Sequence, residues 1–139
     1  MPMNITVKDI MTSVVTCASS DYNVQQLENV MSKYQLSCLP ILDSHGQCVG
    51  VVSAADLIHW HLLRKRASDG QAGEVFSQPT ISVGPDIELT EAVELMVSKN
   101  AHHLIVLDGN ELVGIVSVMD VLAQFLANEC SSFPKHALL

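Results

Sequence analysis

The sequence predicts an α+β fold made of two copies of one small unit, each a small β-sheet with two helices in a βαββα-like order. Two observations predict it. The motif Gly-h-h-Ser-x-x-Asp (h, apolar) begins at Gly50 and again at Gly114. Each copy ends an apolar run typical of a strand and opens a segment with helical spacing. Such a unit cannot bury its faces alone, so we expect the copies to pack about a pseudo-twofold axis.

Apart from a capped turn at the start of the first half, both halves contain the same order of predicted elements. In the first half these are a capped turn at 6–11, a strand at 14–17, a helix at 24–34, strands at 38–42 and 48–53, and a helix at 54–63. In the second half they are a strand at 80–83, a helix at 89–97, strands at 103–107 and 112–117, and a helix at 118–127. Apolar positions at the helical period predict the helices, and turn residues between apolar runs predict the hairpins.

We divide the chain into a first repeat at 1–69 and a second at 70–139, because the small polar stretch Ser68–Gly73 is typical of a linker.

Pro40 falls inside the strand predicted at 38–42. Proline cannot donate to a sheet ladder, so this strand is expected to be an edge or irregular strand.

Composition narrows the possible functions. Fifteen acidic and seven basic side chains give a formal charge of −8. A nucleic-acid binder needs a broad basic face, so no nucleic-acid partner is expected. No apolar run approaches the ~20 residues that span a bilayer, and the N-terminus lacks the basic start and apolar stretch of a secretory signal. We therefore expect no membrane role and a cytoplasmic location.

No catalytic or metal-binding constellation stands out. The four cysteines show no metal-binding spacing and are expected to be thiols: Cys17, Cys38, Cys48 and Cys130. His59 and His61 lie two positions apart on a predicted helix, where side chains diverge by about 200° and cannot easily share an ion. Neither a nucleophile with its base nor a carboxylate pair near a cleft is evident. The sequence therefore predicts neither an enzyme nor a metal site.

The repeated motif has two interpretations that can hold together. Ser-x-x-Asp at a helix start is close to a capping box, in which serine and aspartate satisfy backbone N–H groups of the first turn. The same geometry can bind a ligand, because a helix N-terminus and a hydroxyl attract a phosphate and an aspartate can accept both hydroxyls of a ribose. Gly50 and Gly114 would let a base approach the strand backbone closely.

Both halves resemble CBS (cystathionine-β-synthase) domains, and the whole chain resembles a tandem CBS pair, or Bateman module. The resemblance extends over about residues 7 to 128 and includes Asp9-Ile10-Met11-Thr12, Leu39 to Asp43 and both motif copies. In that family the motif contacts adenosine ligands, its Ser or Thr near the phosphate and its Asp at the ribose. The resemblance implies two clefts between the repeats, each with one Ser–Asp pair: Ser53 with Asp56, and Ser117 with Asp120.

The resemblance implies further ligand contacts at the start of each half. Backbone groups there would frame an adenine, and the implied residues are Val15 and Thr16, and Thr80 and Ile81. Family members that bind phosphate often carry a basic residue just before the Leu-Pro-type strand. The second half has His102 and His103 there, whereas the first has Ser37 and Cys38. Only one histidine can face a cleft, because neighbours in a strand point to opposite faces. We expect unequal clefts and tighter nucleotide binding as the pH falls through ~6.5.

The leading hypothesis is a stand-alone regulatory module that requires no cofactor. It would bind an adenine nucleotide (AMP, ADP or ATP, ahead of S-adenosylmethionine or NADH) in one or both clefts and signal by conformational change to an unknown effector protein. The resemblance also implies a homodimer. Two alternatives stay open: a structural or interaction module with empty clefts whose Ser-x-x-Asp motifs are helix caps, and a metal or redox sensor built on the histidines and cysteines.

Overall fold

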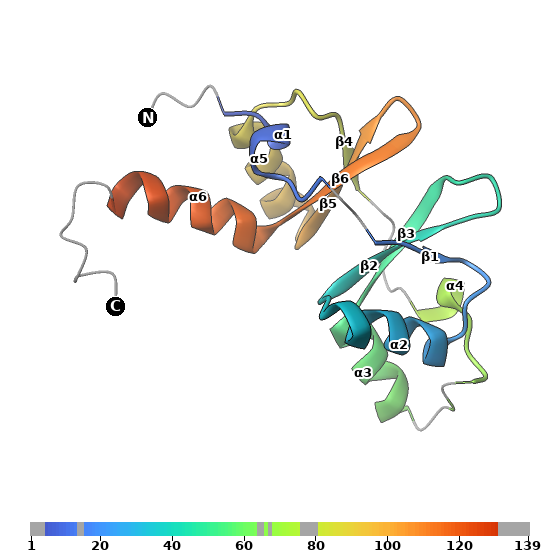
Figure 1. Ribbon diagram of the computed structural model, residues 1–139. Helices are drawn as coiled ribbons and strands as arrows, with labels where there is room; N and C mark the ends of the chain where they lie inside the picture. Colours follow the sequence, from blue (N-terminus) through green and yellow to red (C-terminus); the bar gives the residue numbers. More distant parts are fainter. Residues whose placement is uncertain (1–4, 14–15, 64–65, 67, 76–80, 131–139) are drawn as a thin grey trace. The chain divides into compact units, whose positions relative to one another are not determined.

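The chain forms two compact α+β units, each with its own three-stranded sheet (Figure 1). We call residues 15–80 the first-repeat unit, and residues 1–14 with 81–139 the second-repeat unit. The computed structural model describes residues 5–13, 16–63, 66, 68–75 and 81–130. The predicted fold class is confirmed. None of the helices in this described part of the chain has the length and apolarity needed to cross a bilayer.

The first-repeat unit contains a mixed sheet in the order β1-β2-β3, with β1 parallel and β3 antiparallel to β2. Its elements are β1 (Ala18–Ser19), α2 (Val24–Tyr34), β2 (Cys38–Leu42), β3 (Cys48–Ser53), α3 (Ala54–Leu62) and α4 (Ala72–Val75). Strands β2 and β3 have the predicted bounds. The strand predicted at 14–17 is instead formed by Ala18 and Ser19, because it is Ala18 that is buried in the core and paired with Ile41. Residues 14 and 15 lie outside the described ranges.

The second-repeat unit repeats this topology in the order β4-β5-β6. Its elements are α1 (Val7–Ile10), β4 (Ser82–Val83), α5 (Leu89–Lys99), β5 (His103–Asp108), β6 (Glu111–Ser117) and α6 (Val118–Cys130). The hairpin turns of both units contain a glycine with positive φ, Gly46 at +79° and Gly109 at +65°. Because glycine adopts this backbone conformation without steric cost, the turn residues predict both hairpins correctly.

Pro40 lies in the central strand β2, so the prediction of an edge strand is wrong. A central strand ordinarily needs N–H donors on both sides. Strand β1, however, pairs only with Ile41 and Leu42 of β2 and requires no hydrogen bond from Pro40. At the equivalent position of the other unit, Ile105 donates its N–H to Ile81 O at 2.9 Å. The irregularity that Pro40 also indicated is present as a register shift between Ile41 and Leu42.

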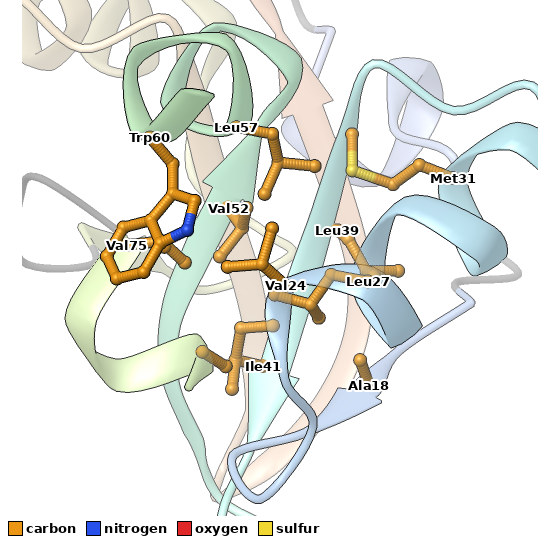
Figure 2. Packing of buried hydrophobic residues seen from close by; sticks show 11 residues of the cluster. Ala18, Val24, Leu27, Met31, Leu39, Ile41, Val52, Leu57, Trp60 and Val75 are labelled. Atoms are coloured by element: carbon orange, nitrogen blue, oxygen red, sulfur yellow. The ribbon is translucent and has the colours of Figure 1, made fainter. Parts of the chain in front are cut away.

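Each unit has a separate hydrophobic core between its sheet and its helices. Figure 2 shows the first-repeat core, whose side chains come from the sheet and from α2, α3 and α4. Its buried residues are Ala18, Val24, Leu27, Met31, Leu39, Ile41, Val52, Leu57, Trp60, Ala72 and Val75. The second-repeat core contains Val7, Val83, Leu89, Ala92, Met96, Leu104, Val106, Val116 and Val121. The predicted helical and strand faces therefore supply both cores.

Each predicted repeat begins with a short helix that belongs to the unit formed mainly by the other repeat. Helix α1 lies at the start of the first repeat, yet Val7 is fully buried in the second-repeat core and donates its N–H to Ile87 O at 3.0 Å. Helix α4 lies at the start of the second repeat, yet Ala72 is buried in the first-repeat core and donates to Tyr22 O at 2.9 Å. The end of the stretch predicted as a linker, 70–73, is therefore part of the first-repeat unit.

Candidate functional site: two strand–helix junctions

The motif serine of each unit ends a strand and caps the helix that follows. Ser53 N donates to Asp56 Oδ2 at 2.8 Å, and Asp56 N donates to Ser53 Oγ at 3.1 Å. Ser117 and Asp120 form the same two bonds at the same distances. Both motifs are thus capping boxes, as the first interpretation predicts. Each bond between the aspartate N–H and the serine uses the hydroxyl as an acceptor, which leaves the hydroxyl proton itself to donate.

The adjacent strand completes each junction. The first amide of α3, Ala54 N, donates to Ser37 O at 2.9 Å, and the first amide of α6, Val118 N, donates to His102 O at 2.9 Å. The next residue along, Cys38 or His103, is the registered partner of the motif serine across the antiparallel pair. We call these two assemblies the Ser53 junction and the Ser117 junction. They share a backbone frame and differ in the side chain beside the serine.

His103, rather than His102, is the histidine associated with the Ser117 junction. It is half-buried at the start of β5, whereas His102 is exposed. Burial lowers the pKa of His103, and the neighbouring His102 lowers it further, while the Asp120 carboxylate acts in the opposite direction. The imidazole is therefore mainly neutral at pH 7. The structure thus selects one of the two histidines that the sequence offered, and places Asp120 within electrostatic reach of it.

The residues expected to frame an adenine are only partly described. Thr16 is half-buried just before β1, and Ile81 is half-buried just before β4. The Ile81 carbonyl accepts the Ile105 N–H, whereas Pro40, which occupies the position equivalent to Ile105, has no N–H to donate. The two candidate frames therefore differ in backbone bonding. Val15 and Thr80 lie outside the described residues.

Gly114 has a different role from the one that the motif suggested. A Cβ at this position would lie 2.5 Å from Met11 Sδ and 2.9 Å from Thr12 O. The close approach that Gly114 permits is therefore that of the N-terminal segment, which also pairs Thr12 with Ile115. At this position the interpretation as a site for a base is wrong, because the chain itself fills the space.

Histidine, cysteine and acidic side chains can also form a metal site or supply a reactive thiol. Within the described ranges, no group of three or more His, Cys, Asp or Glu residues is placed to hold a metal ion. Burial, and to a lesser extent the nearby Cys48, raises the pKa of the Cys17 thiol. Such a thiol stays protonated at neutral pH and is a poor nucleophile.

A groove of about 310 Å³ lies between α2 and α3 in the first-repeat unit. It is lined by Glu28, Met31, Ser32, Leu36, Ala54, Leu57, Ile58 and His61. His61 Nε2 and Glu28 Oε1 are 2.5 Å apart beside it. Sequence reasoning did not find this groove, because helical spacing shows which face is apolar but not whether two such faces leave space between them.

Two similar units, each with a capped strand–helix junction, define a duplicated module with two candidate ligand sites. The family model for the CBS domain matches residues 7–62 and again 72–127. The chain belongs to the CBS domain family, and it is a tandem CBS pair, the kind of module that acts in regulation. The resemblance noted in the sequence is confirmed.

Known proteins similar to this chain agree with that assignment. A CBS domain-containing protein of Bacillus subtilis, YhcV, is 28% identical over 123 residues, which cover 88% of this chain and 87% of YhcV. Inosine-5′-monophosphate dehydrogenase of Methanocaldococcus jannaschii is 31% identical over 119 residues, which cover 85% of this chain but only 22% of that enzyme. The CBS domain pair of protein MJ0100, crystallised with 5′-methylthioadenosine and S-adenosyl-L-methionine, superposes with a TM-score of 0.81 at 24% identity, covering 91% of this chain and 99% of that one.

Proposed function

We propose that the chain is a non-catalytic regulatory module that binds adenosyl ligands at the Ser53 and Ser117 junctions. Ligand binding would change the conformation of the module, and an effector protein would respond to that change. The observation that carries the proposal is the identical Ser–Asp box at both helix starts. A serine hydroxyl can donate to a phosphate or ribose oxygen, and an aspartate can accept from ribose hydroxyls. The adenosyl ligands of the MJ0100 pair, a protein of the same fold, support this choice of chemistry.

The two junctions would take ligands of different charge. The Ser117 junction has His103 opposite its serine, and an imidazolium there would attract a phosphate. The Ser53 junction has Cys38 in that place, and a cysteine side chain carries no positive charge. AMP, ADP or ATP therefore suits the Ser117 junction, whereas a less charged adenosyl compound suits the Ser53 junction.

A structural or interaction module is the competing function, and a specific observation favours it. Both motif aspartates already satisfy backbone N–H groups, so the boxes have a folding role whether or not a ligand binds. Exposed apolar side chains also recur at equivalent positions of α3 and α6: Ile58 and Leu62, and Leu122 and Leu126. We propose that these side chains contact a second copy of the chain, which is compatible with either function.

A thermal-shift panel separates the two functions. The ligands are AMP, ADP, ATP, adenosine, S-adenosylmethionine and NADH, tested on wild type, Asp56→Ala and Asp120→Ala. A ligand at 100 times its Kd adds about 2.7 kcal/mol of stability, which raises the melting temperature by several degrees. We expect AMP stabilisation to be lost in Asp120→Ala and kept in Asp56→Ala.

Asp9→Ala is the matched control for the loss of a cap. Asp9 forms a similar box with Thr6, whose N–H donates to Asp9 Oδ2 at 2.9 Å, but it lies outside the motif. Losing a cap costs roughly 0.5–2 kcal/mol without any ligand, so the quantity to compare is the ligand-induced shift of each variant. If no ligand in the panel stabilises the wild type, the module is structural and the sensor proposal fails.

A further inference from the structure

Trp60 connects the helix of the Ser53 junction to the segment between the repeats. It lies in α3, is only 6% exposed, and its ring lies so close over Gly70 that a Cβ on Gly70 would overlap the indole. Trp60 Nε1 also donates to Arg66 O at 3.0 Å. One side chain thus contacts both ends of the stretch from Arg66 to Gly70.

Asp56 and Trp60 are four residues apart in α3, so their side chains lie on the same face, one turn from each other. A ribose that engages the Asp56 carboxylate competes with the Ser53 N–H, which donates to Asp56 Oδ2. Ligand binding at Asp56 would therefore change the first turn of α3. Because a helix is stiff over one turn, such a change would reach Trp60, whose ring is held by packing in the core.

The segment that Trp60 contacts continues into α4. Gly70 O accepts the Val24 N–H at 2.9 Å, and Ala72 N donates to Tyr22 O at 2.9 Å, so the segment is bonded along its length to the first-repeat unit. In the sequence, α4 leads to Thr80 and Ile81, two residues proposed to frame the other ligand.

We propose that Trp60 acts as a latch that couples ligand occupancy of the Ser53 junction to Arg66 and to residues 68–75. The inference rests on the proposed function of that junction. It is confined to the first repeat: the chain has a single tryptophan, and the motif spacing puts Gln124 at the equivalent position of α6. Signalling from the Ser53 junction is therefore different in kind from signalling from the Ser117 junction.

Hydrogen exchange of the peptide 68–75 tests the latch. Asp69 N, Ala72 N and Glu74 N are hydrogen-bonded in the latched state. Trp60→Phe keeps an aromatic ring and removes the donor to Arg66 O, so we expect these amides to exchange about five-fold faster, as the loss of one hydrogen bond implies. Tyr34→Phe removes a hydroxyl from an exposed ring in the same unit and should change nothing.

The second part of the test measures hydrogen exchange of the same peptide in the presence of ligand. Adenosine and S-adenosylmethionine should change the exchange rate of this peptide in wild type and leave it unchanged in Trp60→Phe, although both proteins show a thermal shift. The emission of the single tryptophan should also change on binding to the wild type. Thermal stabilisation with unchanged emission and an equal change of exchange rate in both proteins would overturn the latch while leaving the proposed function intact. If neither compound binds, the proposed function fails at this junction, and the latch still has to produce faster exchange in ligand-free Trp60→Phe.

Discussion

The Ser53 and Ser117 junctions have the same backbone frame and different chemistry beside it. The distances in their two boxes agree to a tenth of an ångström, yet Cys38 stands beside one serine and His103 beside the other. A cap must keep its geometry for the helix to begin correctly. The residue opposite the serine has no such task. The two repeats therefore share the capping residues that folding requires, whereas the residue beside the serine differs between them.

The largest expected effect concerns the two close approaches at Gly70 and Gly114. Gly70→Ala should lower the free energy of unfolding by an amount near the upper end of about 1–3 kcal/mol, because the added Cβ overlaps the buried Trp60 ring. Gly114→Ala should also be destabilising, because the added Cβ would lie 2.9 Å from Thr12 O, a backbone atom that cannot move aside as the Met11 side chain can. Urea unfolding followed by Trp60 fluorescence and by circular dichroism measures both.

Gly73→Ala is the control for Gly70→Ala. Gly73 lies in α4, and a Cβ there would meet nothing within 4 Å. Since alanine favours a helix over glycine by about 1 kcal/mol, this variant should be neutral or more stable. Equal destabilisation by Gly70→Ala and Gly73→Ala would show that the ring contact is not what matters in this segment.

Local signals in the sequence predict most of the fold. Strands 38–42 and 48–53 have the predicted bounds because alternation, β-branching and a glycine turn are all local properties. The predicted linker at 68–73 includes the first two residues of α4, because glycines at 70 and 73 are typical of a linker. Its burial depends on contacts with Tyr22 and Trp60, far away in the chain, and no local pattern reports such contacts.

The candidate site is predictable in its frame and less so in its surroundings. The motif predicts that Ser117 and Asp120 stand together at a helix start, because capping depends on a spacing of three residues. Strand alternation limits the choice to one of His102 and His103, but only the register with β6 identifies His103. The motif does not predict what approaches Gly114, because the approaching segment, Met11 and Thr12, comes from the other end of the sequence.

The two junctions should also differ in how their ligand affinity depends on pH. His103 is mainly neutral at pH 7 because burial lowers its pKa, and a bound phosphate would favour the imidazolium form. AMP binding should therefore take up a proton and become roughly threefold to tenfold tighter between pH 8 and 6. The ionisable groups that act on His103 are His102 and Asp120. Calorimetric titration at each pH gives the affinity.

His103→Gln should make AMP affinity nearly independent of pH, while His102→Gln should keep most of the dependence. Adenosine, which has no phosphate, should bind equally well throughout the range. A steep pH dependence that survives in His103→Gln would assign the proton to the nucleotide phosphate itself, and His103 would then have no part in ligand selection.

The smallest effect is expected at the N-terminal caps of the two short helices, α1 and α4. Asp9 Oδ2 accepts from Thr6 N at 2.9 Å and from Thr6 Oγ1 at 3.1 Å, whereas Glu74 Oε1 accepts from Gln71 N at 3.3 Å. The Thr6 backbone N–H, then its hydroxyl, holds the pKa of Asp9 below its ordinary value. A lowered carboxyl pKa stabilises the fold fully above the unfolded-state value and is lost as the pH falls through the folded-state value. Asp9→Asn should therefore slightly lower the melting temperature at pH 7. The difference in melting temperature between this variant and wild type should become smaller as the pH falls below about 4.

Glu74→Gln should change the melting temperature less, because its longer bond holds α4 less firmly than the core contacts of Ala72 and Val75 do. Melting curves between pH 7 and 3 measure both variants, and a larger loss in Glu74→Gln would reverse the order of the two caps.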